Sequence, residues 1–163
     1  SRHAILIGAG IGVTPFASIL ESLVLRAEAG RAGALEKAHF FWLNRDQYSF
    51  EWFTALLADV EARDTRRLLD LHLFMTDGRT DVTALAVEMA REVSHAWGRS
   101  DVITGLRTLT RMGAPDWEAE LSRIAALHAP DKVDVFYCGP PGLGLKLRAL
   151  CRKLGLPFRE ERF

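Results

Sequence analysis

A glycine-rich turn near the amino terminus constrains the fold of this chain most strongly. The segment Ile5-Leu-Ile-Gly-Ala-Gly-Ile-Gly-Val-Thr-Pro-Phe16 places a short apolar run before three alternating glycines and a Thr-Pro pair. The apolar run predicts a buried parallel strand over residues 4–7, while Thr14 and Pro15 predict the cap and the first position of a helix. A turn of this kind presents backbone N–H groups and the positive end of a helix, so we expect it to bind a phosphate.

The turn differs from both common phosphate-binding fingerprints. It lacks the Gly-Lys-Ser/Thr of a P-loop, and Val13 stands where G-x-G-x-x-G has its third glycine. A strand-to-helix turn without a ligand is therefore the alternative interpretation of this segment.

Composition restricts the kinds of protein and partner that fit this chain. The chain has 163 residues, of which 48% are hydrophobic, and this is enough for one domain with a core. Its 21 basic and 21 acidic residues balance, so no nucleic-acid partner is expected.

Two cysteines, Cys138 and Cys151, are too few for a disulfide framework and predict a reducing compartment. The apolar stretches fall short of the roughly 20 residues that cross a bilayer, and a start without methionine suggests a domain from a longer protein.

Hydrophobic periodicity alternates between strand and helix along the chain. Strands are expected at residues 4–7, 39–43, 69–76, 133–137 and 157–162, and helices around 16–24, 52–60, 81–97, 117–127 and 143–154. Residues 98–115 are predicted to form a long surface connection. This alternation predicts an α/β fold, a doubly wound, mostly parallel five-stranded sheet of order 3-2-1-4-5 with helices on both faces.

The predicted strand order brings two glycine-bearing loops together. In such sheets ligands bind at the carboxyl ends of the strands where the order reverses, here between the first and fourth strands. The fourth strand ends in Cys138-Gly-Pro-Pro-Gly142. We therefore expect this loop and the segment Gly8–Phe16 to form one nucleotide site.

The second strand ends with an arginine. In the segment Trp42-Leu-Asn-Arg-Asp46, Arg45 occupies the place where an arginine suits the 2′-phosphate of NADP and an acidic residue suits the ribose of NAD. Asp46 is expected to cap the next helix or to orient Arg45. The alternative is a solvated surface pair between Arg45 and Asp46.

Cysteine and histidine chemistry is not indicated. Cys138 lies where this topology approaches the nicotinamide, and without a histidine nearby in sequence we expect it to position the ring rather than to act as a nucleophile. All five histidines lack metal-ligand spacing, so no metal is expected and structural roles are assigned to His3, His39, His72, His95 and His128.

Seven short motifs in order resemble the NADPH oxidase family, most closely its calcium-regulated branch. They are Gly8-Ala-Gly-Ile-Gly-Val-Thr-Pro-Phe16, Trp42-Leu-Asn-Arg-Asp46, Phe50-Glu-Trp-Phe53, Ile103-Thr-Gly-Leu106, Pro115-Asp-Trp117, Cys138-Gly-Pro140 and Phe163. The resemblance runs the length of the chain. It implies that residues 1–163 are the NADPH-binding lobe of a dehydrogenase region, a nucleotide-binding half like that of the ferredoxin reductases.

The resemblance also implies roles for single residues. The pyrophosphate would be held by Gly8, Ala9, Gly10, Ile11, Gly12, Val13, Thr14, Pro15 and Phe16. The 2′-phosphate would contact Arg45, with Asp46, Thr76 and Arg111 as further cofactor-binding residues. The nicotinamide would be flanked by Cys138, Gly139 and Pro140. Phe163 would stack on the flavin, and if it does so where the nicotinamide must stack, we expect it to gate hydride transfer. From the sequence alone, a frayed chain end is the alternative interpretation of this terminal ring.

Family parents carry an FAD-binding domain and a transmembrane haem domain upstream, so these are the expected partners, and this lobe is expected at the cytosolic face of a membrane. Hydride would pass from NADPH to FAD and electrons through haem to dioxygen, giving superoxide or hydrogen peroxide. The lobe would contribute no catalytic acid, base or nucleophile.

One departure from the family pattern concerns cofactor choice. Family members commonly carry Gly-Arg-Pro where this chain has Gly113-Ala114-Pro115. Arg111 or Arg107 could replace the missing arginine, or NADH could be accepted as well. Two other functions stay open, the lobe of a flavin or ferric reductase and a nucleotide-sensing module without redox chemistry. The sequence upstream of this lobe would discriminate between them.

Overall fold

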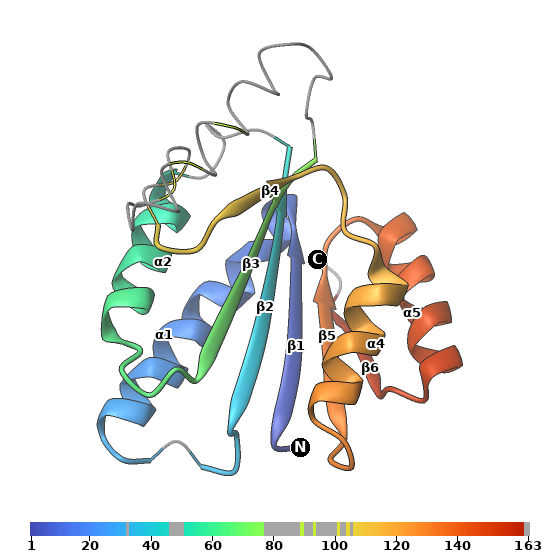
Figure 1. Ribbon diagram of the computed structural model, residues 1–163, viewed down its shortest axis with the longest axis horizontal. Helices are drawn as coiled ribbons and strands as arrows, with labels where there is room; N and C mark the ends of the chain where they lie inside the picture. Colours follow the sequence, from blue (N-terminus) through green and yellow to red (C-terminus); the bar gives the residue numbers. More distant parts are fainter. Residues whose placement is uncertain are drawn as a thin grey trace.

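The computed structural model describes residues 1–31, 33–45, 51–76, 89, 93, 101, 104 and 106–161. Across these residues six strands form one parallel sheet of order β4-β3-β2-β1-β5-β6 (Figure 1). The strands are β1 His3–Ala9, β2 Lys37–Asn44, β3 Leu69–Met75, β4 Thr110–Met112, β5 Val133–Cys138 and β6 Phe158–Glu161.

The helices lie on both faces of the sheet. Figure 1 shows α1 (Thr14–Glu28) and α2 (Glu51–Arg63) on one face, and α4 (Trp117–Leu127) and α5 (Pro141–Leu154) on the other. This arrangement follows from right-handed crossovers that run outward from β1 in both directions. The helix expected over residues 81–97 falls largely outside the described residues, although Met89 and Val93 are helical.

The predicted order 3-2-1-4-5 is confirmed, but the strand count of five is wrong by one. The added strand β4 lies inside the segment 98–115, where the sequence predicts a surface connection. It pairs with the end of β3, Leu73 opposite Thr110, and is continued by a bond from the N–H of Gly113 to the carbonyl of Met75 at 2.8 Å. Three residues are too few for alternating hydrophobicity, so the pairing partner rather than the local sequence determines this strand.

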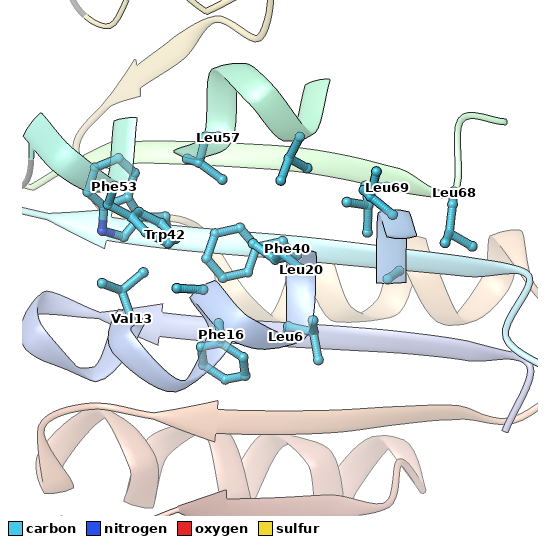
Figure 2. Packing of buried hydrophobic residues seen from close by; sticks show 14 of the residues in the cluster. Leu6, Val13, Phe16, Leu20, Phe40, Trp42, Phe53, Leu57, Leu68 and Leu69 are labelled. Atoms are coloured by element: carbon cyan, nitrogen blue, oxygen red, sulfur yellow. The ribbon is translucent and has the colours of Figure 1, made fainter. Parts of the chain in front are cut away.

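Two apolar cores explain why the central strands are hydrophobic along their whole length. Leu6, Phe16, Leu20 and Phe40 are buried between the sheet and the helices α1 and α2 (Figure 2). A second cluster lies under α4 and α5, with Ile5, Ile7, Phe41, Leu121 and Tyr137 among its members. Because neighbouring residues of β1 point to opposite faces and both faces are covered, the strand carries apolar residues without alternation.

The segment Gly10–Glu28, with 19 residues, is long and apolar enough to cross a membrane by length and composition alone. The expectation that every apolar stretch falls short of that length is therefore wrong. In the fold, Phe16, Leu20 and Val24 of this segment are buried in the core beneath α1. The apolar character of the segment thus serves packing against the sheet.

Substitutions on two neighbouring residues of α1 test this packing. Leu20 is fully buried whereas Ile19 is 42% exposed. We expect Leu20→Ala to lower the free energy of unfolding by about 2–5 kcal/mol, because it leaves a cavity. Ile19→Ala should cost below about 1 kcal/mol. Urea unfolding measures both, and equal losses would contradict the described orientation of α1.

Candidate nucleotide site

The glycine turn continues β1 into α1 through one turn of 3-10 helix. Ala9 ends the strand, Gly10–Val13 form the 3-10 turn η1, and α1 begins at Thr14. Gly10 has a φ of +58°, a left-handed conformation that favours glycine. Val13 and Phe16 are buried in the core below, while Ile11 is 81% exposed above it. The turn is thus anchored by two apolar side chains and presents its backbone at the carboxyl edge of the sheet.

The helix start differs from the predicted one. Thr14 is the first helical residue rather than the cap, Pro15 is the second, and the cap position belongs to Val13. Because Val13 is already helical, with φ −74° and ψ −24°, the Thr14 hydroxyl turns back and donates to the carbonyl of Ile11 at 3.0 Å. The first turn of α1 has neither a side-chain cap nor an acidic residue among the described residues. Its positive end is therefore not neutralised by this part of the chain.

The two glycine-bearing loops are in contact. A Cβ atom added to Gly12 would lie 2.3 Å from the carbonyl oxygen of Cys138 and 2.8 Å from the Cα of Gly139. Register supports this contact, because Gly8 of β1 lies opposite Cys138 of β5. Only glycine allows the turn after β1 to approach the loop after β5 this closely. The predicted meeting of Gly8–Phe16 and the Cys138 loop is therefore present in the structure.

Cys138 is buried and closes the end of β5. Its side chain is 2% exposed, and burial, followed by the nearby Glu161 and Glu160 carboxylates, raises the pKa of the thiol. The group accordingly stays protonated at neutral pH and is a poor nucleophile. The loop behind it is fixed by the Tyr137 hydroxyl, which donates to the carbonyl of Pro140 at 2.7 Å.

The ends of β2 and β3 are joined through Asn44. Its carbonyl accepts from the backbone N–H of Thr76 at 2.8 Å and from the Thr76 hydroxyl at 3.2 Å, while its side-chain oxygen accepts from the N–H of Arg45 at 2.9 Å. The Arg45 side chain is exposed, and it forms no ion pair with another described residue. Arg45 and Thr76 are therefore held together at one edge, whereas Asp46 lies outside the described residues.

Arg111 is already paired. It lies on β4 opposite Phe74, its guanidinium is 5.7 Å from the centre of that ring, and it forms an ion pair with Glu120 of α4 at 3.2 Å. Its side chain remains 58% exposed. A phosphate at Arg111 would have to share the guanidinium with a carboxylate.

Sequence reasoning missed two residues of this edge. Asn44 belongs to the motif that ends β2, but an asparagine at this position does not by itself predict the hydrogen bonds that it makes. Glu120 carried no signal, since its pairing with Arg111 depends on the placement of α4 beside β4. Phe163, expected on the flavin, lies outside the described residues.

Comparison with known proteins identifies the family. The profile described as "Ferric reductase NAD binding domain" matches residues 2–152. The chain belongs to this ferric reductase NAD-binding domain family. It is 40% identical to human NADPH oxidase 5 over 186 aligned residues, which cover 100% of this chain and 24% of that protein. It is 36% identical to the heavy chain of a superoxide-generating NADPH oxidase from Dictyostelium discoideum, covering 90% of this chain and 28% of the relative.

A third relative, rat dual oxidase 2, is 35% identical over 98% of this chain and 10% of its own length. The resemblance to NADPH oxidases is thereby confirmed along the chain. The ferric reductase NAD-binding domain described here spans between a tenth and somewhat over a quarter of each of these three relatives.

The contact between the two loops can be tested with paired glycine variants. Gly12→Ala should weaken NADPH binding by about tenfold or more, equivalent to about 1.4 kcal/mol, because the new methyl group separates the turn from the Cys138 carbonyl. Gly142→Ala is the matched control, since nothing lies within 4 Å of a Cβ at that position. Isothermal titration calorimetry gives both dissociation constants. Equal binding by the two variants would show that the close approach is not needed for the nucleotide.

Proposed function

We propose that the chain is the NADPH-binding lobe of a membrane NADPH oxidase. The observation that carries the proposal is the contact of Gly12 with Cys138 and Gly139 at the point where the strand order reverses. In doubly wound sheets dinucleotides bind across this crevice. The three relatives described above, all named as oxidases, give the reaction class.

The turn after β1 suits the pyrophosphate of NADPH. Gly10 supplies a left-handed backbone position, and the first turn of α1, which no described side chain caps, points its positive end at the same edge. Backbone N–H groups and the helix dipole together favour an anion there. We assign the pyrophosphate to Gly8–Phe16 on these grounds.

The adenosine end is assigned to the ends of β2 and β3. Arg45 offers an exposed guanidinium that makes no ion pair with described residues, and an arginine can bind a phosphate through two parallel hydrogen bonds. Thr76 and Asn44 fix the neighbouring backbone. Because Arg111 is shared with Glu120, it is assigned a secondary role.

The nicotinamide end is assigned to residues 138–140. Bound NADPH and FAD supply the hydride transfer themselves, so the lobe needs only to bind and orient. The protonated, buried thiol of Cys138 fits a positioning role, and the loop behind it is held by Tyr137.

The parent protein is proposed to contain the two partners of this lobe. An FAD-binding domain would accept the hydride, and a transmembrane haem domain would carry electrons to dioxygen to give superoxide or hydrogen peroxide. The lobe would lie at the cytosolic face of the membrane. A ferric reductase parent is the second candidate, favoured by the description of the matching family. The electron acceptor used by the whole parent distinguishes the two.

Nucleotide preference tests the assignment of Arg45. The unmodified chain should bind NADPH more tightly than NADH, and Arg45→Ala should reduce that preference by roughly tenfold or more, because a hydrogen bond to a charged group contributes about 1.5–3 kcal/mol. Calorimetric titration at one salt concentration measures the four dissociation constants.

Arg31→Ala, at an exposed position just after α1, is the matched control, and it should keep the preference of the unmodified chain. If Arg45→Ala keeps the preference for NADPH, another residue of this edge must bind the 2′-phosphate.

Phe163 is proposed to cover the flavin and to move before hydride transfer. In the parent protein, Phe163→Ala should change the rate of flavin reduction or the NADPH-over-NADH preference, since an aromatic ring that blocks the nicotinamide has been removed. Stopped-flow absorbance of the flavin measures the rate. Unaltered values for both quantities would refute the gate.

A further inference from the structure

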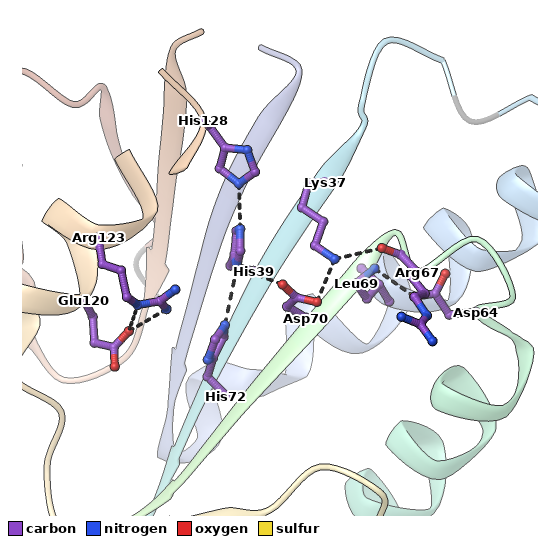
Figure 3. Close-up of polar contacts among 10 residues, drawn as sticks. All are labelled: Lys37, His39, Asp64, Arg67, Leu69, Asp70, His72, Glu120, Arg123 and His128. Carbon is purple, nitrogen blue, oxygen red and sulfur yellow. Dashed lines mark hydrogen bonds and ion pairs between the residues drawn. The ribbon is translucent and has the colours of Figure 1, made fainter. Parts of the chain in front are cut away.

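Four of the five histidines gather at the end of the sheet opposite the nucleotide site. His3 is the first residue of β1, His39 the third of β2 and His72 the fourth of β3, while His128 directly follows α4. Figure 3 shows His128, His39 and His72 in a row across the sheet. Each lies far from the others in sequence, so only the fold brings them together.

The rings are in direct contact. Nε2 of His39 lies 2.8 Å from Nε2 of His128, and Nδ1 of His39 lies 3.4 Å from Nε2 of His72. The rings of His3 and His128 stack with centroids 3.9 Å apart. His39 is 1% exposed. The contacts within the row are thus ring nitrogen pairs and ring stacking.

Each nitrogen–nitrogen contact in the row accommodates one proton. A neutral imidazole donates through one nitrogen and accepts through the other, so the neutral row satisfies both contacts with one proton in each. A single extra proton on His39 can be tolerated, because both of its nitrogens then donate. A second extra proton on His72 or His128 can leave two N–H groups facing each other. The native row therefore binds fewer protons than the same rings bind when the chain is unfolded.

The carboxylates beside the row are already engaged. Asp70 of β3 approaches Nδ1 of His39 at 3.6 Å, but it also pairs with Lys37 of β2 at 2.6 Å. Asp131 lies 3.4 Å from Nε2 of His3 and 3.5 Å from Arg2. Neither carboxylate is thus free to stabilise a charged imidazole fully.

The charges around His72 are similarly balanced. Glu120 of α4 favours a charged His72, but it is paired with Arg123 of the same helix at 2.8 Å and with Arg111 of β4 at 3.2 Å. The ring of His72 also stacks on Phe41 with centroids 4.3 Å apart. The charges around His72 therefore largely offset one another, and its burial decides the direction of its pKa shift.

Burial is the main reason that the rings resist protonation. It lowers the pKa of His39 and of His72 to about 4, against partial opposition from Asp70 and Glu120 respectively. Burial followed by the neighbouring His3 also lowers the pKa of His128. Since an unfolded histidine titrates near 6.5, the unfolded chain takes up protons below that pH while the folded chain does not. The contribution of His39 and His72 to the free energy of unfolding is therefore present above about pH 6.5, and it is lost as the pH falls towards 4.

We propose that His39, His72 and His128 form an acid-sensitive latch that ties the amino-terminal halves of β2 and β3 to the end of α4, with His3 of β1 stacked on His128. The latch is closed when the rings are neutral, and it opens when the row receives more protons than its contacts accommodate. It lies towards the end of the strands opposite the proposed nucleotide site, and the pair of Arg111 with Glu120 lies between His72 and that site.

Proton uptake on unfolding tests the latch. Urea unfolding of the chain between pH 5 and 7.5 gives the free energy of unfolding at each pH, and its slope gives the number of protons taken up. We expect an uptake of about two protons near pH 5.5, where most carboxylates are still ionised in both states. His72→Phe keeps an aromatic ring on Phe41 and should lower the uptake by about one proton. A slope near zero in the unmodified chain, or an unchanged slope in His72→Phe, would overturn the proposal.

Leu20→Ala is the matched control for this experiment, because it destabilises the opposite core without touching the histidines. Its slope should equal that of the unmodified chain. Titration of the histidine ring protons by NMR gives a second test that needs no variant. At least two rings should remain neutral until the chain unfolds, whereas five rings that all titrate near pH 6.5 in the folded chain would overturn the latch.

Discussion

The close approach of Gly12 to the Cys138 carbonyl is the constraint on which the functional edge depends. The turn after β1 and the loop after β5 belong to neighbouring strands whose connections leave in opposite directions. They approach each other so closely that a Cβ atom added to Gly12 would lie 2.3 Å from the carbonyl oxygen of Cys138. The glycine therefore sets how far the positive end of α1 lies from the loop that is assigned to the nicotinamide.

Strand pairing and core packing hold the two loops at this distance. β1 pairs with β2 on one side and β5 on the other, and its apolar residues pack into a core on each face. Val13 and Phe16 anchor the turn from below, so its backbone groups rather than its side chains face the edge. The opposite half of the same strands carries the histidine row, of which His39 is buried.

The order of the five long strands could be predicted from the sequence, because strands and helices alternate with distinct periodicities and right-handed crossovers leave few topologies. The meeting of the two glycine loops followed from that order. The strand β4 could not be predicted, since it depends on pairing with Leu73 and its neighbours. The Thr14 cap was mispredicted because Val13 already adopts helical angles.

Side-chain contacts between distant elements could not be predicted from the sequence either, because they also depend on the tertiary structure. The ion pair of Arg111 with Glu120 and the row of His39 with His128 each join segments that only the tertiary structure brings together. Each histidine taken alone indicated a structural role, and their clustering became apparent only from the positions of β1, β2, β3 and α4.

Amide chemical shifts during an NADPH titration test the central claim most directly. The chain labelled with nitrogen-15 should show its largest changes at Gly10, Gly12 and Gly139 on both sides of the crevice, with further changes at Arg45. Changes confined to one loop, or centred on the histidine end of the sheet, would contradict a dinucleotide site at the switch point.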